Sequence, residues 1–145
     1  MNSRGSGVNR RTVNSGLYSA YFGEIGSQGH ISQSISTIVG SAYDFSFAYL
    51  SDGGRPNSFT ASFGGTPVFS VVNDSRHGFQ THTFTGLVAS SNNTIIDFGI
   101  RNDPGFQRLE DISVKPSAAV PEPETLALLG LGLLGLAASR RKSAK

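Results

Sequence analysis

The chain has 145 residues, including 18 glycines, 10 phenylalanines and 4 tyrosines; 15% of its residues are charged and none is cysteine. This length allows one ordinary domain, and the lack of cysteine excludes disulfides, zinc–thiolate sites and a thiol nucleophile. The formal net charge is +2, but residues 12–139 hold five basic residues against all ten acidic ones. A nucleic-acid-binding surface needs Lys and Arg gathered on the folded body. Because the body has more acidic than basic residues, nucleic-acid-binding proteins are excluded.

Residues 1–16 are polar, basic and rich in Gly, Ser and Asn. They lack the run of about 7–15 apolar residues that a secretory signal requires. We predict a disordered basic arm here. Three explanations stay open: a protein that is not exported, a start mis-called downstream of the true one, or a truncated fragment. The C-terminal tail described below favours the mis-called start.

Residues 17–115 alternate short apolar runs with turn signals about every ten residues, which is typical of an antiparallel sandwich or barrel. The clearest strand is 43–49, where four aromatic residues alternate with Asp44, Ser46 and Ala48 and so share one face. Seven further strands are predicted at 17–22, 31–36, 58–63, 68–72, 81–87, 94–100 and 109–114. Eight short strands predict an all-β antiparallel jelly roll, with an immunoglobulin-like sandwich as the alternative.

The sequence of residues 17–115 gives no clear sign of a catalytic site. The three histidines, His30, His77 and His82, do not form a helical metal-binding pair, and the Gly-x-Ser-x-Gly elbow of many hydrolases is missing. We therefore predict a protein that is not an enzyme.

A small cluster of acids lies near the end of the body. Asp103, Glu110 and Asp111 fall within ten residues, and calcium prefers carboxylate and carbonyl oxygens. The spacing lacks the order of an EF-hand loop, so solvated acids that cap turns are the alternative. We keep a structural calcium at these three residues as a hypothesis and predict no other cofactor.

The last 30 residues differ in composition from the body. Residues 116–119 form a predicted linker, and Pro121 and Pro123 in the following Val120-Pro121-Glu122-Pro123 hold the chain extended and exposed. Residues 126–138 are uncharged with no polar face, and Arg140-Arg141-Lys142 follows at once. As a helix this segment spans about 20 Å against a hydrocarbon core of about 30 Å, so a transient membrane segment is expected rather than a permanent anchor.

This order of elements closely resembles the PEP-CTERM sorting signal of Gram-negative bacteria. The resemblance implies cleavage by an exosortase, a membrane-embedded cysteine transpeptidase, and export through an inner-membrane intermediate to the cell surface or extracellular matrix. By position it assigns the cleavage motif to Val120, Pro121, Glu122 and Pro123, the membrane segment to Leu126, Leu128, Leu129, Leu131, Leu133, Leu134 and Leu136, and the cytoplasmic stop to Arg140 and Arg141.

The body resembles galactose-binding-like jelly-roll domains over residues 31–35, 43–47, 59–65, 101–106 and 109–114. The resemblance implies carbohydrate binding in some members. A sugar site needs an exposed aromatic ring beside planar polar groups. The predicted loops supply Arg55, Asn57, Arg76, His77, Phe79, Asn102, Asp103, Phe106 and Arg108, although each of these residue types also has ordinary structural roles.

Two functions follow as hypotheses. The first is an exported, non-enzymatic surface or matrix protein, processed at its tail and linked to exopolysaccharide or biofilm. The alternative is a carbohydrate-binding or adhesive module with one defined glycan ligand. Both have an exosortase-type enzyme, the membrane and extracellular polysaccharide as expected partners.

Overall fold

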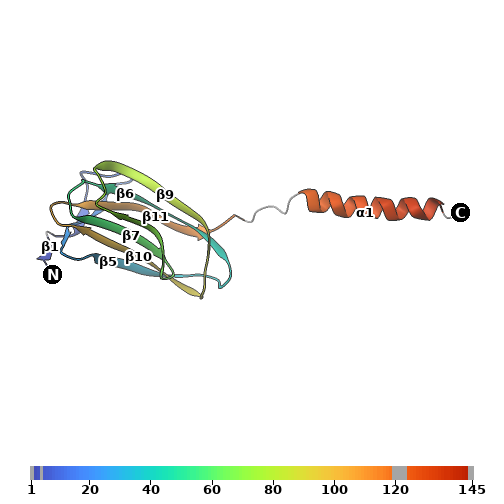
Figure 1. Ribbon diagram of the computed structural model, residues 1–145, viewed down its shortest axis with the longest axis horizontal. Coiled ribbons are helices and arrows are strands. Elements are labelled where there is room, and N and C mark those ends of the chain that lie inside the picture. Colours follow the sequence, from blue (N-terminus) through green and yellow to red (C-terminus); the bar gives the residue numbers. More distant parts are fainter. Residues whose placement is uncertain (1, 4, 119–123, 144–145) are drawn as a thin grey trace.

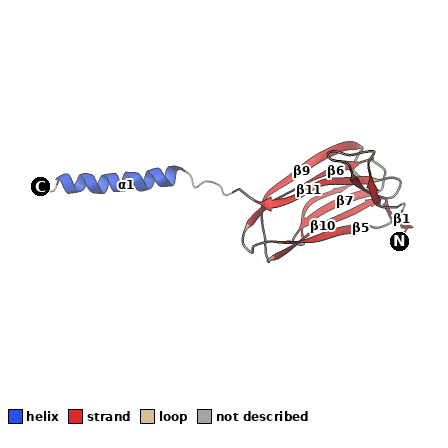
Figure 2. Cartoon of the chain, turned by 180° about the vertical axis from the view of Figure 1, so that it is seen from behind, coloured by secondary structure: helices blue, strands red, loops and turns tan. Residues whose placement is uncertain are grey.

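The computed structural model describes residues 2–3, 5–118 and 124–143. It contains two packed β-sheets, a small two-stranded ribbon, and one C-terminal helix that stands apart from the sheets (Figure 1). This confirms the predicted all-β antiparallel sandwich with a C-terminal helix. Figure 2 shows the strands of both sheets running along the long axis of the molecule.

Both sheets are antiparallel throughout the described residues. One has the order β5-β10-β7-β8, with strands at Gly29–Ser36 (β5), Asn93–Asn102 (β10), Asn57–Phe63 (β7) and Thr66–Val72 (β8). The facing sheet has the order β2-β3-β11-β6-β9, with strands at Gly7–Asn9 (β2), Ser19–Phe22 (β3), Gln107–Pro116 (β11), Ala42–Ser51 (β6) and His77–Val88 (β9). A small ribbon joins Asn2–Ser3 (β1) to Glu24–Ile25 (β4). All eight predicted strands are present, most of them longer than predicted.

The N-terminal arm is more ordered than its composition predicted. In its described part, β2 pairs with β3, and the backbone amides of Asn14 and Ser15 donate to Oε2 of Glu110 at 2.6 and 3.0 Å. Glu110 is buried, and these hydrogen bonds satisfy Oε2 of its carboxylate, which would be costly to bury alone, whereas Oε1 has no hydrogen-bond partner among the described residues. The prediction of a disordered arm over residues 1–16 is therefore wrong for the residues described.

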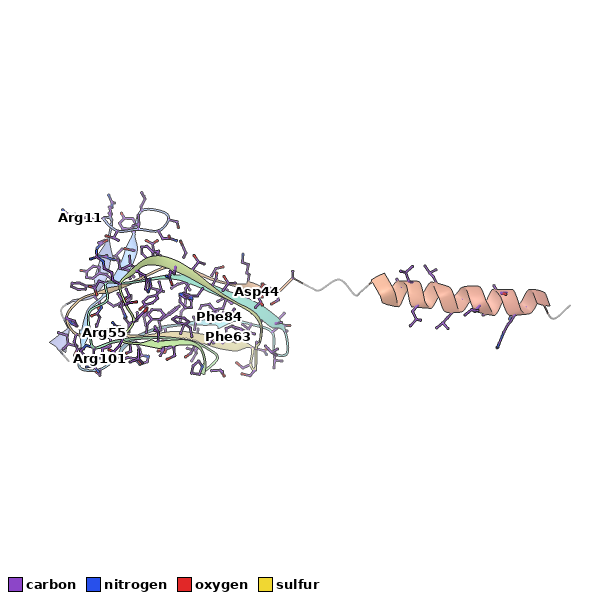
Figure 3. The ribbon with its side chains drawn as sticks, turned by 45° about the horizontal axis from the view of Figure 1, so that its top comes forward. Arg11, Asp44, Arg55, Phe63, Phe84 and Arg101 are labelled. Atoms are coloured by element: carbon purple, nitrogen blue, oxygen red, sulfur yellow. The ribbon has the colours of Figure 1, made fainter. Side chains whose placement is uncertain are left out.

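Aromatic side chains fill the space between the sheets. Phe45, Phe47 and Tyr49 alternate along β6 as predicted and are fully buried. The Phe47 ring centroid lies 5.2 Å from that of Phe98 on β10, and the Tyr49 ring stacks on Phe59 of β7 at 4.1 Å. Figure 3 shows Phe63 and Phe84 between the two sheets. Cross-sheet ring packing of this kind is the main source of stability here.

One histidine lies at the margin of this core. The ring of His82 lies 4.3 Å from Phe69 and 5.4 Å from Phe47, and its Nε2 is buried with no hydrogen-bond partner among the described residues. Burial, with a smaller electrostatic contribution from His77, lowers the pKa of His82 below its usual 6.5. His82 is therefore a neutral member of the aromatic cluster at neutral pH.

We expect this histidine to make the fold acid-sensitive. The unfolded chain takes up a proton at His82 near pH 6.5 while the folded chain resists it, so stability should fall as the pH drops below about 6.5. Thermal midpoints of the wild type and His82→Phe, measured between pH 8 and 5, should show a shallower pH dependence for the variant. Parallel curves for the two proteins would contradict this role for His82.

The two ends of the sandwich carry different parts of the chain. Strand β11 runs from Gln107, opposite Ser51, to Pro116, opposite Tyr43. The loops at 52–56, 73–76 and 103–106 meet at the Gln107 end, which we call the loop end, and the chain leaves for the helix from the Pro116 end (Figure 1). Figure 3 places Arg55 and Arg101 at the loop end and Asp44 at the tail end.

The C-terminal helix, α1, spans Glu124–Ser143 and so extends beyond the predicted 126–138 at both ends. The described side chains of residues 127–141 are all exposed, with Leu134 at 70%. Within the described chain, no helix combines the length and the apolar character needed to cross a membrane. Val120, Pro121, Glu122 and Pro123 lie outside the described residues.

Candidate functional site

Two buried asparagines build the loop end. Asn57 is 1% exposed; its Nδ2 donates to the carbonyl oxygens of Gly54 and of Asp74, the latter at 2.9 Å, and its Oδ1 accepts from the Asp74 amide at 3.0 Å. Asn102 is fully buried, and its Oδ1 accepts from the Gly105 amide at 3.1 Å. Each asparagine thus satisfies backbone groups that would otherwise be buried without partners.

Asp52 joins the loop at 52–56 to the loop at 103–106. Its Oδ1 accepts from Nδ2 of Asn102 at 2.8 Å, and its Oδ2 accepts from the Phe106 amide at 2.6 Å. A Cβ at Gly105 would lie 2.2 Å from Oδ2 of Asp52, so this close approach requires glycine. The shape of the loop end is therefore set by internal hydrogen bonds.

These contacts correct the prediction that two of the loop asparagines contact a glycan. Asn57 and Asn102 were expected to reach a sugar, but their side chains are buried and their polar atoms already have partners in the protein. Asparagine in a turn is usually exposed, so the sequence pattern gave no sign that these two point inward. They position the loops rather than contact a ligand.

A pocket of about 560 Å³ opens beside these loops. Its lining comes from the arm, the outer face of the larger sheet and two loops: Thr12, Leu50, Ser51, Asp52, Arg76, His77, Gly78 and Arg108. Of the residues predicted from the sequence, Arg76, His77 and Arg108 are therefore brought together. Thr12 comes from a distant segment, and no local sequence signal indicates its place here.

The charged and polar side chains of this pocket differ in whether they have hydrogen-bond or ion-pair partners. His77 contacts Oδ2 of Asp74 through Nε2 at 2.9 Å and the carbonyl oxygen of Gly78 through Nδ1 at 2.6 Å. Neither Arg76 nor Arg108 makes an ion pair within the described part of the chain. Nη1 of Arg108 is buried and has no hydrogen-bond partner among those residues. A buried donor without an acceptor is costly, so this guanidinium favours a ligand oxygen.

The remaining predicted glycan residues lie around the pocket and do not line it. Arg55 is exposed on the loop at 52–56, and Phe79 is half-buried on β9. Phe106 is half-buried and packs edge-on against Tyr21, with ring centroids 5.7 Å apart. These residues could contact only a ligand that extends beyond the pocket.

Asp103 is already occupied by protein groups. Its two carboxylate oxygens accept from Nε and Nη2 of Arg101 at 2.7 and 2.9 Å, and the Gly26 amide donates to Oδ1 at 3.0 Å. The Arg101 hydrogen bonds, followed by the Gly26 amide, lower the pKa of Asp103 to about 2. Asp103 therefore stabilises the loop end as a carboxylate.

The other two acids of the predicted calcium set hold the arm instead. Glu110 accepts from backbone amides of the arm, and Asp111 accepts from Oγ of Ser15 at 2.5 Å and Nδ2 of Asn14 at 2.8 Å. These side-chain hydrogen bonds, Ser15 first, lower the pKa of Asp111. Over the ranges described, no three His, Asp or Glu side chains gather to hold a metal. The structure does not bring the predicted calcium ligands together.

The C-terminal tail matches a known family of sequences. A family described as the PEP-CTERM protein-sorting motif matches residues 119–142. The chain carries a PEP-CTERM sorting motif. This confirms the resemblance seen in the sequence, and the motif indicates export and sorting to the cell surface, with processing by an exosortase-type enzyme implied. No curated protein matches the chain at a significant level.

Among the solved structures with a similar fold are several carbohydrate-binding modules. TmCBM61 in complex with β-1,4-galactotriose is 15% identical with a TM-score of 0.58, covering 77% of this chain and 82% of that one. CBM35 from Cellvibrio japonicus Abf62 is 13% identical with a TM-score of 0.58 and coverages of 81% and 87%. CBM6cm-2 from Cellvibrio mixtus lichenase 5A, in complex with cellotriose, is 14% identical with a TM-score of 0.52 and coverages of 81% and 91%. At these identities the likeness shows the jelly-roll fold.

Proposed function

We propose that this chain is a non-enzymatic carbohydrate-binding module of an exported surface protein, and that it binds an acidic saccharide in the loop-end pocket. The observation that carries this proposal is the pair of arginines, Arg76 and Arg108, that line the pocket without carboxylate partners in the described chain. The jelly-roll fold, shared with modules whose structures contain galactotriose and cellotriose, supports a sugar ligand.

The chemistry of the pocket fits a sugar acid better than a neutral sugar. A guanidinium is planar and always charged, and it binds a carboxylate through two parallel hydrogen bonds. Leu50 offers an apolar surface for a pyranose face, and Asp52 fixes the loop rather than neutralising the arginines. Asp52 is the acid that lines the pocket, and Asp74 contacts the lining residue His77; the Asp52 carboxylate accepts hydrogen bonds from Asn102 and the Phe106 amide. Acids more than about 8 Å from a bound ligand are largely screened at physiological salt.

The tail supplies the second part of the proposed function. Residues 126–138 enter the inner membrane transiently, with Arg140 and Arg141 on the cytoplasmic side, and an exosortase-type enzyme cuts at Pro121-Glu122-Pro123. The mature protein then reaches the cell surface or the extracellular matrix. There it retains exopolysaccharide and so contributes to biofilm structure.

Substitutions in the pocket test the glycan proposal. We expect Arg108→Ala to weaken binding of an oligogalacturonide or oligoglucuronide by about 10–100-fold, because a hydrogen bond to a charged group contributes about 1.5–3 kcal/mol. Arg76→Ala should weaken it less, because Arg76 is more exposed. Isothermal titration calorimetry with the full chain, using uronide and neutral oligosaccharides of equal length, measures both effects.

Arg55→Ala is the matched control, since Arg55 lies at the same end of the sandwich but does not line the pocket. Its affinity should equal that of the wild type. An equal loss of affinity in Arg55→Ala would move the ligand out of the pocket. If neither a uronide nor a neutral oligosaccharide saturates the protein at millimolar concentration, the carbohydrate-binding proposal fails.

A further inference from the structure

Strand β5 differs from the other sheet edges of the described sandwich. The opposite edge of its sheet, β8, contains Pro67 and a register shift, β9 has two register shifts, and β2 is only three residues long. By contrast, all eight residues of β5 pair with β10 without a shift. It contains no proline, lysine, arginine, aspartate or glutamate. Natural edge strands normally carry such features to prevent pairing with another chain.

An apolar groove of about 650 Å³ runs beside this edge. Ile31 and Ile35 of β5 line one side, and Ile112 and Val114 of β11 line the other. The groove exists because β3 pairs with β11 only at residues 107–109 in the described structure, which leaves the tail-end half of β11 without a neighbour on that side. Ile31 is 44% exposed and Ile112 is 50% exposed, so these side chains lack cover.

The sequence of β5 is self-complementary. Residues 31–35 have the palindromic sequence Ile-Ser-Gln-Ser-Ile. In an antiparallel pair of two copies centred on Gln33, each Gln33 faces the other, and Ile31 faces Ile35 of the second copy. Side chains alternate along a strand, so the isoleucines meet on the groove side and the serines meet on the opposite face.

We infer that β5 is a dimerisation edge, through which a second copy of this chain pairs antiparallel in the register that sets Gln33 opposite Gln33. The two four-stranded sheets then form one continuous sheet, and the pairing gives hydrogen-bond partners to the outer edges of both β5 strands. The palindrome favours a second copy over an unrelated peptide, because an identical strand sets each of residues 31–35 opposite a residue of the same type. Such an interface is isologous and closes at two copies.

Cysteine cross-linking tests the register in a chain that has no cysteine of its own. Directly opposed residues of an antiparallel pair have Cα atoms about 4.5–5.5 Å apart, within the range that a disulfide spans. We expect full-length Gln33→Cys, held in detergent to cover α1, to give a covalent dimer on mild oxidation. Ser70→Cys, also exposed and on the β8 edge, is the matched control and should stay monomeric.

Charge substitutions give an independent measurement. Gln33→Lys and Gln33→Glu each place like charges opposite one another, so each alone should sediment as a monomer, and an equimolar mixture should recover the dimer. All these variants keep α1, so association through the helix would not respond to residue 33. If Gln33→Cys cross-links no faster than Ser70→Cys, or the wild type sediments as a monomer at high micromolar concentration, the inference is overturned. The glycan affinity of the pocket is measured separately and does not depend on this result.

Discussion

Phe47→Ala should lower the free energy of unfolding of the sandwich by about 3–5 kcal/mol. The Phe47 ring is fully buried and lies within 5.2–6.1 Å of the rings of Phe98 on β10, Phe59 on β7, and Phe69 and Phe84 on β8 and β9. Removal of the ring leaves a cavity between the two sheets, and a shift of one sheet alone cannot close it. A domain of this size has about 5–15 kcal/mol in total, so urea unfolding should show a large shift of the midpoint.

Tyr18→Ala provides the comparison for this loss. Tyr18 is also aromatic, but it is 49% exposed, and its ring contact is with Arg10, whose guanidinium carbon lies 4.6 Å from the ring centroid. Its loss should cost less than about 1 kcal/mol. Equal midpoint shifts for the two variants would mean that the cross-sheet cluster is not the main source of stability.

Pro121→Ala should abolish processing of the tail in a cell that has the matching exosortase-type enzyme. Pro121 is part of the motif that such an enzyme is proposed to recognise, and alanine in its place would restore a backbone N–H and free the φ angle that proline fixes. Intact mass spectrometry should find the wild type shortened within residues 120–123, whereas the variant should retain Lys145. We expect the change to be nearly complete rather than graded.

Pro116→Ala is the matched control, because Pro116 is also a proline ahead of the helix but ends β11 instead of belonging to the motif. This variant should be processed like the wild type. A wild-type protein that still ends at Lys145 in such a cell would remove the proposed sorting role of the tail. Loss of processing in both variants would point to a general effect on the extended segment.

The sequence predicted the strands of the core well, because their signal is local. In β6 the alternation of aromatic and small or polar residues places one row of side chains inward, and the structure buries Phe45, Phe47 and Tyr49 as expected. The strands β1, β2 and β4 were missed. Each has only two or three residues and is held by backbone pairing, which leaves no periodic pattern of side chains.

The candidate site could be predicted only in part. Turn chemistry located the loops that meet at one end, but whether a loop asparagine faces solvent or the interior depends on contacts between loops that are distant in sequence. Asn57 is an example. It was predicted to contact a sugar, but its side chain forms hydrogen bonds with Gly54 and Asp74 and so holds the loops in place. The three acids predicted to bind calcium have different partners for a similar reason. Glu110 and Asp111 accept hydrogen bonds from the N-terminal arm, and Asp103 accepts hydrogen bonds from Arg101.

The pocket and the departure of the tail lie at opposite ends of β11, whose ten residues span about 33 Å. The proposed cleavage within residues 120–123 therefore leaves the cut end about a full domain length from the proposed saccharide pocket. A saccharide held at the loop end would not meet the processed end, so the two ends of the sandwich are free to make separate contacts at the same time.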